Sequence, residues 1–164
     1  MVKKLSRTIR GRRMEHRPIA AVGVWFYALS TDRYLYLLRN DKKHPGTWGL
    51  PGGKVEKPET LLNALERECR EELNFWPEPI KLAPIEQFTS PDGHFTYHTF
   101  FSLIENEFSP TLNHEHFGYA WIDSGHLPNP MHPGLWSTTN IKSVKMKVNT
   151  LKNSYKSQYD TNLL

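Results

Sequence analysis

Cysteine is almost absent from this chain, which contains one in 164 residues. A single cysteine excludes an internal disulfide and a cysteine-based zinc cluster. The chain also lacks an apolar run near the roughly 20 residues of a membrane-spanning helix. Its basic start, MVKKLSRTIRGRRMEHR, lacks the apolar segment of a secretory signal. These absences favour a cytoplasmic protein with no membrane partner, and the length fits one domain.

Charge is distributed unevenly along the chain, whose net charge is +4. Seven Lys and Arg against one Glu give residues 1–17 a charge of +6, and five Lys against one Asp give residues 140–164 a charge of +4. Residues 18–139 therefore carry −6, unlike a uniformly basic nucleic-acid-binding protein. We expect a solvated basic N-terminal arm (1–17), a domain (18–148) and a C-terminal tail (149–164).

Apolar runs separated by turn sequences predict the strands. The run 19–29 is too continuous for a half-exposed strand and indicates a buried one, with 34–38 pairing back on it. The turn Ser90-Pro91-Asp92-Gly93 predicts a long hairpin around it. With one clear helix after residue 60 and a weaker one near 135–148, the pattern predicts a mixed-sheet α/β domain. The expected strands are 19–29, 34–38, 54–56, 80–89, 95–104 and 119–122.

The most informative stretch runs from Gly49 to Phe75 and reads GLPGGKVEKPETLLNALERECREELNF. Helix start signals converge on three consecutive residues: Pro58 suits a first turn, Glu59 favours the positive helix end, and Thr60 can cap it. At about 100° per residue, one helix face collects the apolar side chains that must pack on the sheet. These are Leu62, Leu65, Cys69 and Leu73.

Another face of this helix carries Glu68, Glu71 and Glu72. Like charges at these spacings repel each other, and a hard divalent cation such as Mg²⁺ would offset that cost. A glutamate cluster alone is most often a solvated surface. The preceding loop, Leu50 to Lys54, contains two glycines, so a ligand can approach its backbone closely. It is not a P-loop, because Val55 stands where Ser or Thr is required.

The whole arrangement resembles the Nudix hydrolase family of MutT-like nucleoside diphosphate-X pyrophosphohydrolases, whose box reads G-x5-E-x7-R-E-U-x-E-E-x-G-U. Cys69 and Phe75 occupy aliphatic positions here, and Asn74 stands where the family has glycine. Asn tolerates the left-handed conformation that ends a helix, so the departure leaves the helix end intact. The remaining box positions are filled by Gly53, Glu59, Arg67, Glu68, Glu71 and Glu72.

The resemblance implies a Nudix-type α/β/α sandwich and a hydrolase that cleaves a diphosphate linkage with Mg²⁺, or with Mn²⁺ in its place. It implies that Arg67 forms an ion pair with Glu59 that orients the helix against the loop. The general base then lies within the box, with Glu71 the foremost candidate, or on a later loop. Outside the box, Glu105 and Glu115 are the candidates. The implied metal ligands are Glu68, Glu71, Glu72 and the Gly53 carbonyl.

The substrate and partners stay open at this level. The resemblance allows a (d)NTP, ADP-ribose or another nucleotide sugar, a dinucleoside polyphosphate, or an RNA 5′ end bound by the basic tails. A non-catalytic nucleotide sensor is the other alternative. The presence of all box glutamates argues against it, because such domains usually lose them. The oligomeric state stays open and could be a homodimer. Trp48, Tyr97 and Trp121 could stack a base but are expected in the core. His132-Pro133-Gly134 could line the substrate mouth, and the other histidines are expected in structural or surface roles.

Overall fold

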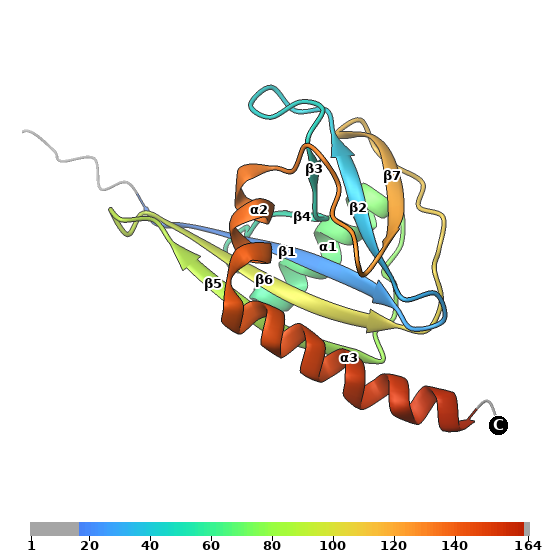
Figure 1. Cartoon of the computed structure of the whole chain (residues 1–164). Coiled ribbons are helices and arrows are strands. Elements are labelled where there is room, and N and C mark those ends of the chain that lie inside the picture. The colour runs from blue at the N-terminus through green and yellow to red at the C-terminus, as the bar shows by residue number, and fades with distance from the viewer. Residues whose placement is uncertain (1–16, 163–164) are drawn as a thin grey trace, which may run out of the picture.

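A mixed sheet forms the centre of the computed structural model, which describes residues 17–162 (Figure 1). Its hydrogen-bonded order is β3-β2-β1-β6-β5, with β4 paired to β1 and β7 paired to β2. The strands are β1 (Ile19–Ala28), β2 (Arg33–Arg39), β3 (Trp48–Gly49), β4 (Gly52–Lys54), β5 (Lys81–Thr89), β6 (Phe95–Ile104) and β7 (His116–Asp123). The helices are α1 (Leu61–Leu73), α2 (Pro133–Asn140) and α3 (Lys142–Asn162).

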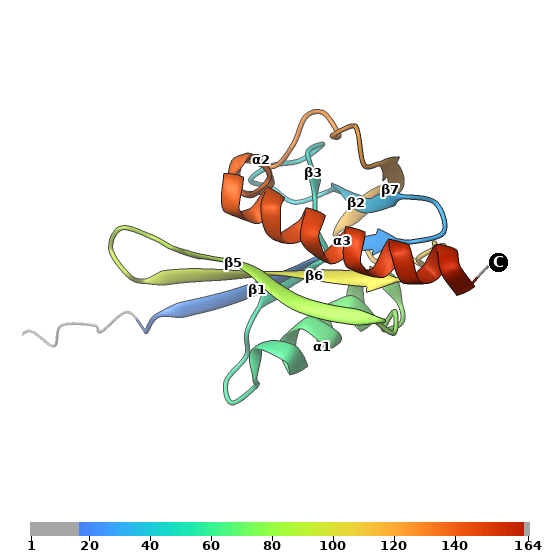
Figure 2. The ribbon, with the colours of Figure 1, turned by 60° about the horizontal axis from the view of Figure 1, so that its bottom comes forward.

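Helices cover both faces of this sheet (Figure 2). Val22, Val24 and Phe26 of β1 point into the core beneath α1. Trp25 and Tyr27 point to the opposite face, into the core beneath α2 and α3. Because successive side chains of a strand alternate between faces, the continuous apolar run of β1 reflects burial on both sides. The structure therefore confirms a mixed-sheet α/β/α sandwich.

β1 and β2 form the predicted hairpin, but they pair only next to their turn, where Tyr27 lies opposite Tyr34 and Ala28 opposite Arg33. Towards its start, β1 pairs instead with β4, while β2 pairs with β3 and β7. The two strands therefore diverge, and we call this divergence the fork (Figure 1). The connection from β3 to β4 joins its two arms. β4 begins two residues before the strand that the sequence predicts at 54–56.

α1 begins and ends as predicted. Thr60 caps it by accepting a hydrogen bond from the Asn63 N–H at 3.1 Å, and Asn74 ends it with a left-handed φ of 69°. Three residues of the predicted buried face, Leu65, Cys69 and Leu73, are fully buried, but Leu62 is 52% exposed. Leu62 precedes Cys69 by seven residues and so lies only about 20° from it around the helix. Its exposure therefore reflects its place in the first turn of α1 and not the direction in which it points. The sequence analysis missed the burial of Glu72, which lies about 20° from Leu65 around the helix.

The C-terminal region differs from the prediction of one helix near 135–148 followed by a tail. Ile141 has extended backbone and separates α2 from α3, and α3 then continues to Asn162. Its later turns carry apolar side chains that pack on the core, and Lys152 lies 3.3 Å from an Asp32 carboxylate oxygen and over the Tyr27 ring. The extra turns are therefore stabilised by tertiary contacts. The apolar residues concerned are Leu151, Tyr155 and Tyr159.

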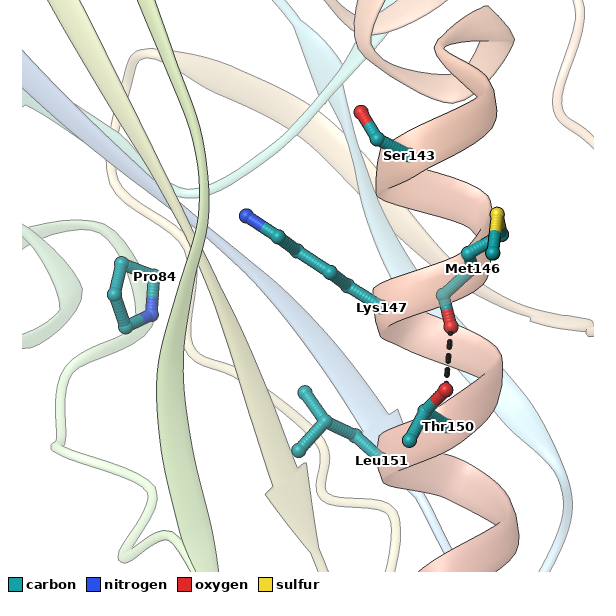
Figure 3. Close-up of a pocket in the computed structure, with 6 residues that line it drawn as sticks. All are labelled: Pro84, Ser143, Met146, Lys147, Thr150 and Leu151. Carbon is teal, nitrogen blue, oxygen red and sulfur yellow. Dashed lines mark hydrogen bonds between the residues drawn. The ribbon is translucent and has the colours of Figure 1, made fainter.

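α3 also protects the edge of the sheet. Lys147 extends towards β5 (Figure 3), and its Nζ donates to the Ile85 carbonyl at 3.4 Å. The β5–β6 register shifts between Pro84 and Glu86, where proline has no N–H to donate to its neighbour. Lys147 therefore supplies a hydrogen-bond donor to a backbone carbonyl of β5 at the point where this edge strand is irregular. Within residues 17–162, no helix is long and apolar enough to cross a membrane.

Candidate active site

Arg67 ties α1 to the loop that precedes it. Its Nε and Nη2 donate to the two carboxylate oxygens of Glu59, at 2.7 and 3.1 Å, and Nη2 also donates to the Lys54 carbonyl at 2.9 Å. A forked pair of this kind fixes orientation as well as distance. The predicted ion pair is confirmed. The same contact lowers the pKa of Glu59, helped by the hydrogen bond from the Glu56 N–H.

Glu72 is the buried member of the carboxylate cluster, with 2% of its surface exposed. One of its carboxylate oxygens accepts a hydrogen bond from the Gly52 N–H at 2.7 Å, and the other lies 3.9 Å from His116 Nε2. Burial raises the pKa of Glu72 well above its usual range, and the charges of Glu68 and Glu115 add to this. Burial, with Arg39, lowers the pKa of His116 to about 4, so the imidazole is neutral at pH 7.

Glu68 lies directly against Gly53. A Cβ built on Gly53 would come within 2.4–2.6 Å of the carboxylate oxygens of Glu68, so any other residue here would displace them. Burial raises the pKa of Glu68, while Arg67, whose Nη1 donates to it at 3.0 Å, acts in the opposite sense. Glu71 lies at the surface and reaches the same Nη1 at 3.3 Å. The three glutamates therefore differ sharply in environment.

The structure separates the two candidate bases outside the box. Glu115, which precedes β7, is close enough for its charge to raise the pKa of both Glu68 and Glu72. Glu105 follows β6, and its carbonyl accepts the Ser30 N–H at the other end of β1. Because Gly53 pairs at Val22 and β6 ends opposite Ala28, about 20 Å of strand lies between Glu105 and the cluster. Glu105 is therefore not part of this site.

The donor set of this cluster fits a hard divalent cation. Carboxylate oxygens and backbone carbonyls are the ligands that Mg²⁺ and Mn²⁺ take in proteins. Among the described residues, the Glu72 carboxylate has one N–H donor and no cationic partner in direct contact, and the glycine backbone at Gly53 leaves room for the oxygens of Glu68. As the side chains lie in this structure, however, no three or more acidic, histidine or cysteine residues within 17–162 are grouped so that they could hold a metal ion. Arg67 instead bridges Glu68 and Glu71.

Arg39 is a residue of this region that the sequence analysis missed. It ends β2 beside the fork, forms an ion pair with Asp41, and lies close enough to influence the pKa of Glu72, His116 and His132. The sequence signal that could have identified Arg39 is an arginine followed two residues later by an aspartate, at the end of an apolar strand.

His132 comes to the same side of the molecule from the start of α2. Its Nδ1 accepts the Gly134 N–H at 3.0 Å, and its ring centroid lies 4.6 Å from that of His44. Burial lowers the pKa of His132 to about 4. Within the described part of the chain, a hollow of about 520 Å³ lies elsewhere, between β5 and α3 (Figure 3). The candidate site is therefore identified from the chemistry of its side chains and not from this hollow.

Comparisons with known proteins agree with this geometry. The model of the NUDIX domain family matches residues 17–140. The chain is 34% identical over 98 residues to nucleoside triphosphatase NudI of Klebsiella pneumoniae, covering 52% of this chain and 67% of that protein. It is 28% identical over 111 residues to a putative 8-oxo-dGTP diphosphatase of Bacillus subtilis, covering 68% of this chain and 72% of that protein.

Two solved structures illustrate the fold similarity. The MutT NUDIX hydrolase from Burkholderia pseudomallei superposes with a TM-score of 0.63 at 22% identity, covering 79% of this chain and 97% of that one. The NUDIX domain of Shewanella oneidensis NrtR, crystallised with ADP ribose, has a TM-score of 0.55 at 16% identity, covering 66% and 74%. At these identities the likeness supports the fold alone.

Proposed function

The chain belongs to the NUDIX family, and from this premise we propose that it is a Mg²⁺-dependent hydrolase that cleaves a diphosphate linkage in a small nucleotide. The observation that carries the proposal is the buried Glu72 carboxylate, which accepts the Gly52 N–H and lies between two further acidic groups. A buried carboxylate among negative charges is costly unless a cation joins it. Its contact with the Gly52 N–H supports phosphate binding beside the glycine-bearing β4.

Glu68, Glu71, Glu72 and the Gly53 carbonyl would hold Mg²⁺, or Mn²⁺ as a substitute. When bound, the ion polarises a phosphoryl oxygen and lowers the pKa of its bound water. Arg67 positions the helix by holding Glu59 and the Lys54 carbonyl. Without this contact the carboxylates of α1 would lose their fixed place against β4.

Two glutamates are candidates for the general base that accepts a proton from the attacking water. Glu71 lies at the surface of α1 with 53% of its side chain exposed, so it can leave Arg67 without disturbing the core. Glu115 lies in the loop before β7, with its backbone N–H held by the Asn113 side chain at 3.0 Å. Both therefore reach solvent next to the buried carboxylates.

A nucleoside triphosphate is the substrate class we favour. The printed functions of the relatives, a nucleoside triphosphatase and an 8-oxo-dGTP diphosphatase, support this choice. The ADP ribose bound by a structural neighbour supports nucleotide sugars as the next class.

The test is hydrolysis of a panel of NTPs, dNTPs and nucleotide sugars with Mg²⁺, with products separated by chromatography. Glu71→Gln should lower kcat/KM by on the order of 100-fold, and EDTA should abolish turnover. Glu66→Gln is the matched control, because Glu66 lies on the same helix and, within residues 17–162, pairs only with Arg70, at 2.7 Å. Equal losses for both variants, or turnover that EDTA leaves intact, would show that the assignment is wrong.

A further inference from the structure

Gly23 interrupts a strand of large buried side chains, and the reason lies in Tyr97. A Cβ on Gly23 would come within 1.9 Å of the Tyr97 hydroxyl oxygen and 2.8 Å of its Cζ. The hydroxyl end of the Tyr97 ring therefore occupies the space that a side chain at position 23 would fill, on the face of β1 that also carries Trp25. Tyr97 itself is on β6, opposite Ala21, so the ring extends two residues further along the neighbouring strand.

The direction of the ring carries its hydroxyl towards the carboxylate cluster. β6 and β4 lie on opposite sides of β1, so a ring that crosses β1 from β6 points at β4. Gly23 pairs with Gly52, whose N–H donates to Glu72. The hydroxyl thus lies about one strand spacing, roughly 5 Å, to the side of the Gly52 backbone that holds the buried carboxylate, on the face of β1 opposite α1.

The Tyr97 hydroxyl has no hydrogen-bond partner within residues 17–162, and its oxygen is not among the fully enclosed atoms that lack one. Tyr97 as a whole is partly exposed. Burial raises the pKa of this hydroxyl, and the charges of Glu72, Glu86 and Glu68 act in the same direction, so the group stays protonated. Leaving such a donor unpaired in a partly buried place costs stability. That cost is offset when a ligand accepts the hydrogen bond.

We propose that the Tyr97 hydroxyl donates a hydrogen bond to a phosphoryl oxygen of the bound diphosphate, an inference that rests on the proposed function. A phosphate that approaches Glu68 and Glu72 meets negative charge. The neutral Tyr97 O–H, close enough for the charges of both glutamates to raise its pKa, attracts a phosphate in the fork from the opposite face of the sheet without competing for the cation. Arg39 lies on the other arm of the fork, close enough to influence the same hydroxyl. Tyr97 therefore contributes to diphosphate binding, and Gly23 provides the space that lets it reach.

The experiment measures binding of methylenediphosphonate, a non-hydrolysable diphosphate without a nucleoside, by calorimetry in the presence of Mg²⁺. Tyr97→Phe removes only the hydroxyl and should weaken binding about tenfold or more, as expected for a hydrogen bond to a charged group. The melting temperature of the ligand-free variant should be unchanged or higher, because an unpaired polar group is removed. The control is Tyr119→Phe on β7, where the tyrosine is 39% exposed and binding should not change.

The outcomes separate this inference from the proposed function. Equal affinity of the wild-type protein and Tyr97→Phe overturns the inference alone, and so does a loss seen with a nucleotide but not with methylenediphosphonate. A lower melting temperature of the variant with unchanged affinity would assign the hydroxyl a structural role instead. Absence of diphosphate binding by the wild-type protein overturns both proposals together.

Discussion

Replacing Glu72 by glutamine should make the metal-free protein more stable and should remove its stabilisation by Mg²⁺. The wild-type carboxylate is 2% exposed, has one hydrogen bond from the Gly52 N–H, and lies near a neutral His116 and two further glutamates. A glutamine has the same length, and its amide oxygen can still accept the Gly52 N–H. The substitution therefore removes the buried negative charge and keeps the shape.

The size and pH dependence of this effect follow from the environment of the carboxylate. The pKa of Glu72 is raised in the folded state, so folded protein retains a proton that the unfolded chain releases above about pH 4.3. Stability of the metal-free wild-type protein then falls as pH rises through this region, until Glu72 ionises in the folded state. An incompletely paired buried group costs about 1–3 kcal/mol, which corresponds to roughly 2–12 °C in melting temperature for a chain of this size.

Thermal melts with EDTA and with Mg²⁺, at about pH 5 and about pH 8, measure both effects. With EDTA, the advantage of Glu72→Gln over the wild-type protein should be larger at the higher pH. With Mg²⁺, the wild-type melting temperature should rise and that of the variant should not. Glu66→Gln, on an exposed part of the same helix, should follow the wild-type protein in all conditions.

Two results would refute this reasoning. If Glu72→Gln melted below the wild-type protein in EDTA at the higher pH, the ionised carboxylate would be well solvated or paired in the folded state. If Mg²⁺ raised the melting temperature of both proteins equally, the ion would bind elsewhere. Either result would remove Glu72 from the proposed metal site while leaving the fold assignment intact.

Two further predictions concern the end of α1 and the N-terminal arm. Asn74→Val should destabilise the protein by about 1 kcal/mol or more, because φ is 69° at this position and a β-branched residue resists a positive φ. Asn74→Gly should be neutral or slightly stabilising. Equal melting temperatures of the wild-type and Asn74→Val proteins would argue against a left-handed residue at position 74. Deletion of residues 1–16 should leave kcat/KM for nucleotides within about threefold, because no box residue lies there. Repeating that assay with a 5′-triphosphorylated RNA at two salt concentrations tests the alternative, since a salt-sensitive loss confined to RNA would make the arm an RNA-binding segment.

Features that depend on neighbours in the chain could be predicted from the sequence. Thr60 and Asn74 delimit α1 as expected, because capping and left-handed backbone are local properties of a few residues. The pair of Arg67 with Glu59 was implied by the resemblance to the Nudix family and is present at 2.7 Å. The β5–β6 hairpin likewise followed from its turn sequence. The roles of these residues in catalysis stay proposals.

Features that depend on distant segments could not be predicted in this way. Helical periodicity placed Leu62 on the buried face and Glu72 on another, but Leu62 in the first turn of α1 is 52% exposed and Glu72 is 2% exposed. Lys152 was counted as part of a solvated tail, yet it is held by Asp32 and the Tyr27 ring, more than a hundred residues earlier. Such contacts form between residues that are distant in the sequence, so they can be identified only after the fold has brought both residues together.

The sequence by itself determined the family, the fold class and the set of box residues, because these follow from residue types at fixed spacing. Only the tertiary structure decided which carboxylates act together. Glu115 joins the cluster and Glu105 does not, since the pairing of β7 with β2 brings Glu115 to Asn40, whereas the pairing of β6 with β1 carries Glu105 past Ala28. It also decided that Tyr97 crosses Gly23 towards Gly52, because this contact needs three strands in one order. Local spacing specifies the helix and its glutamates, whereas long-range strand pairing selects what surrounds them.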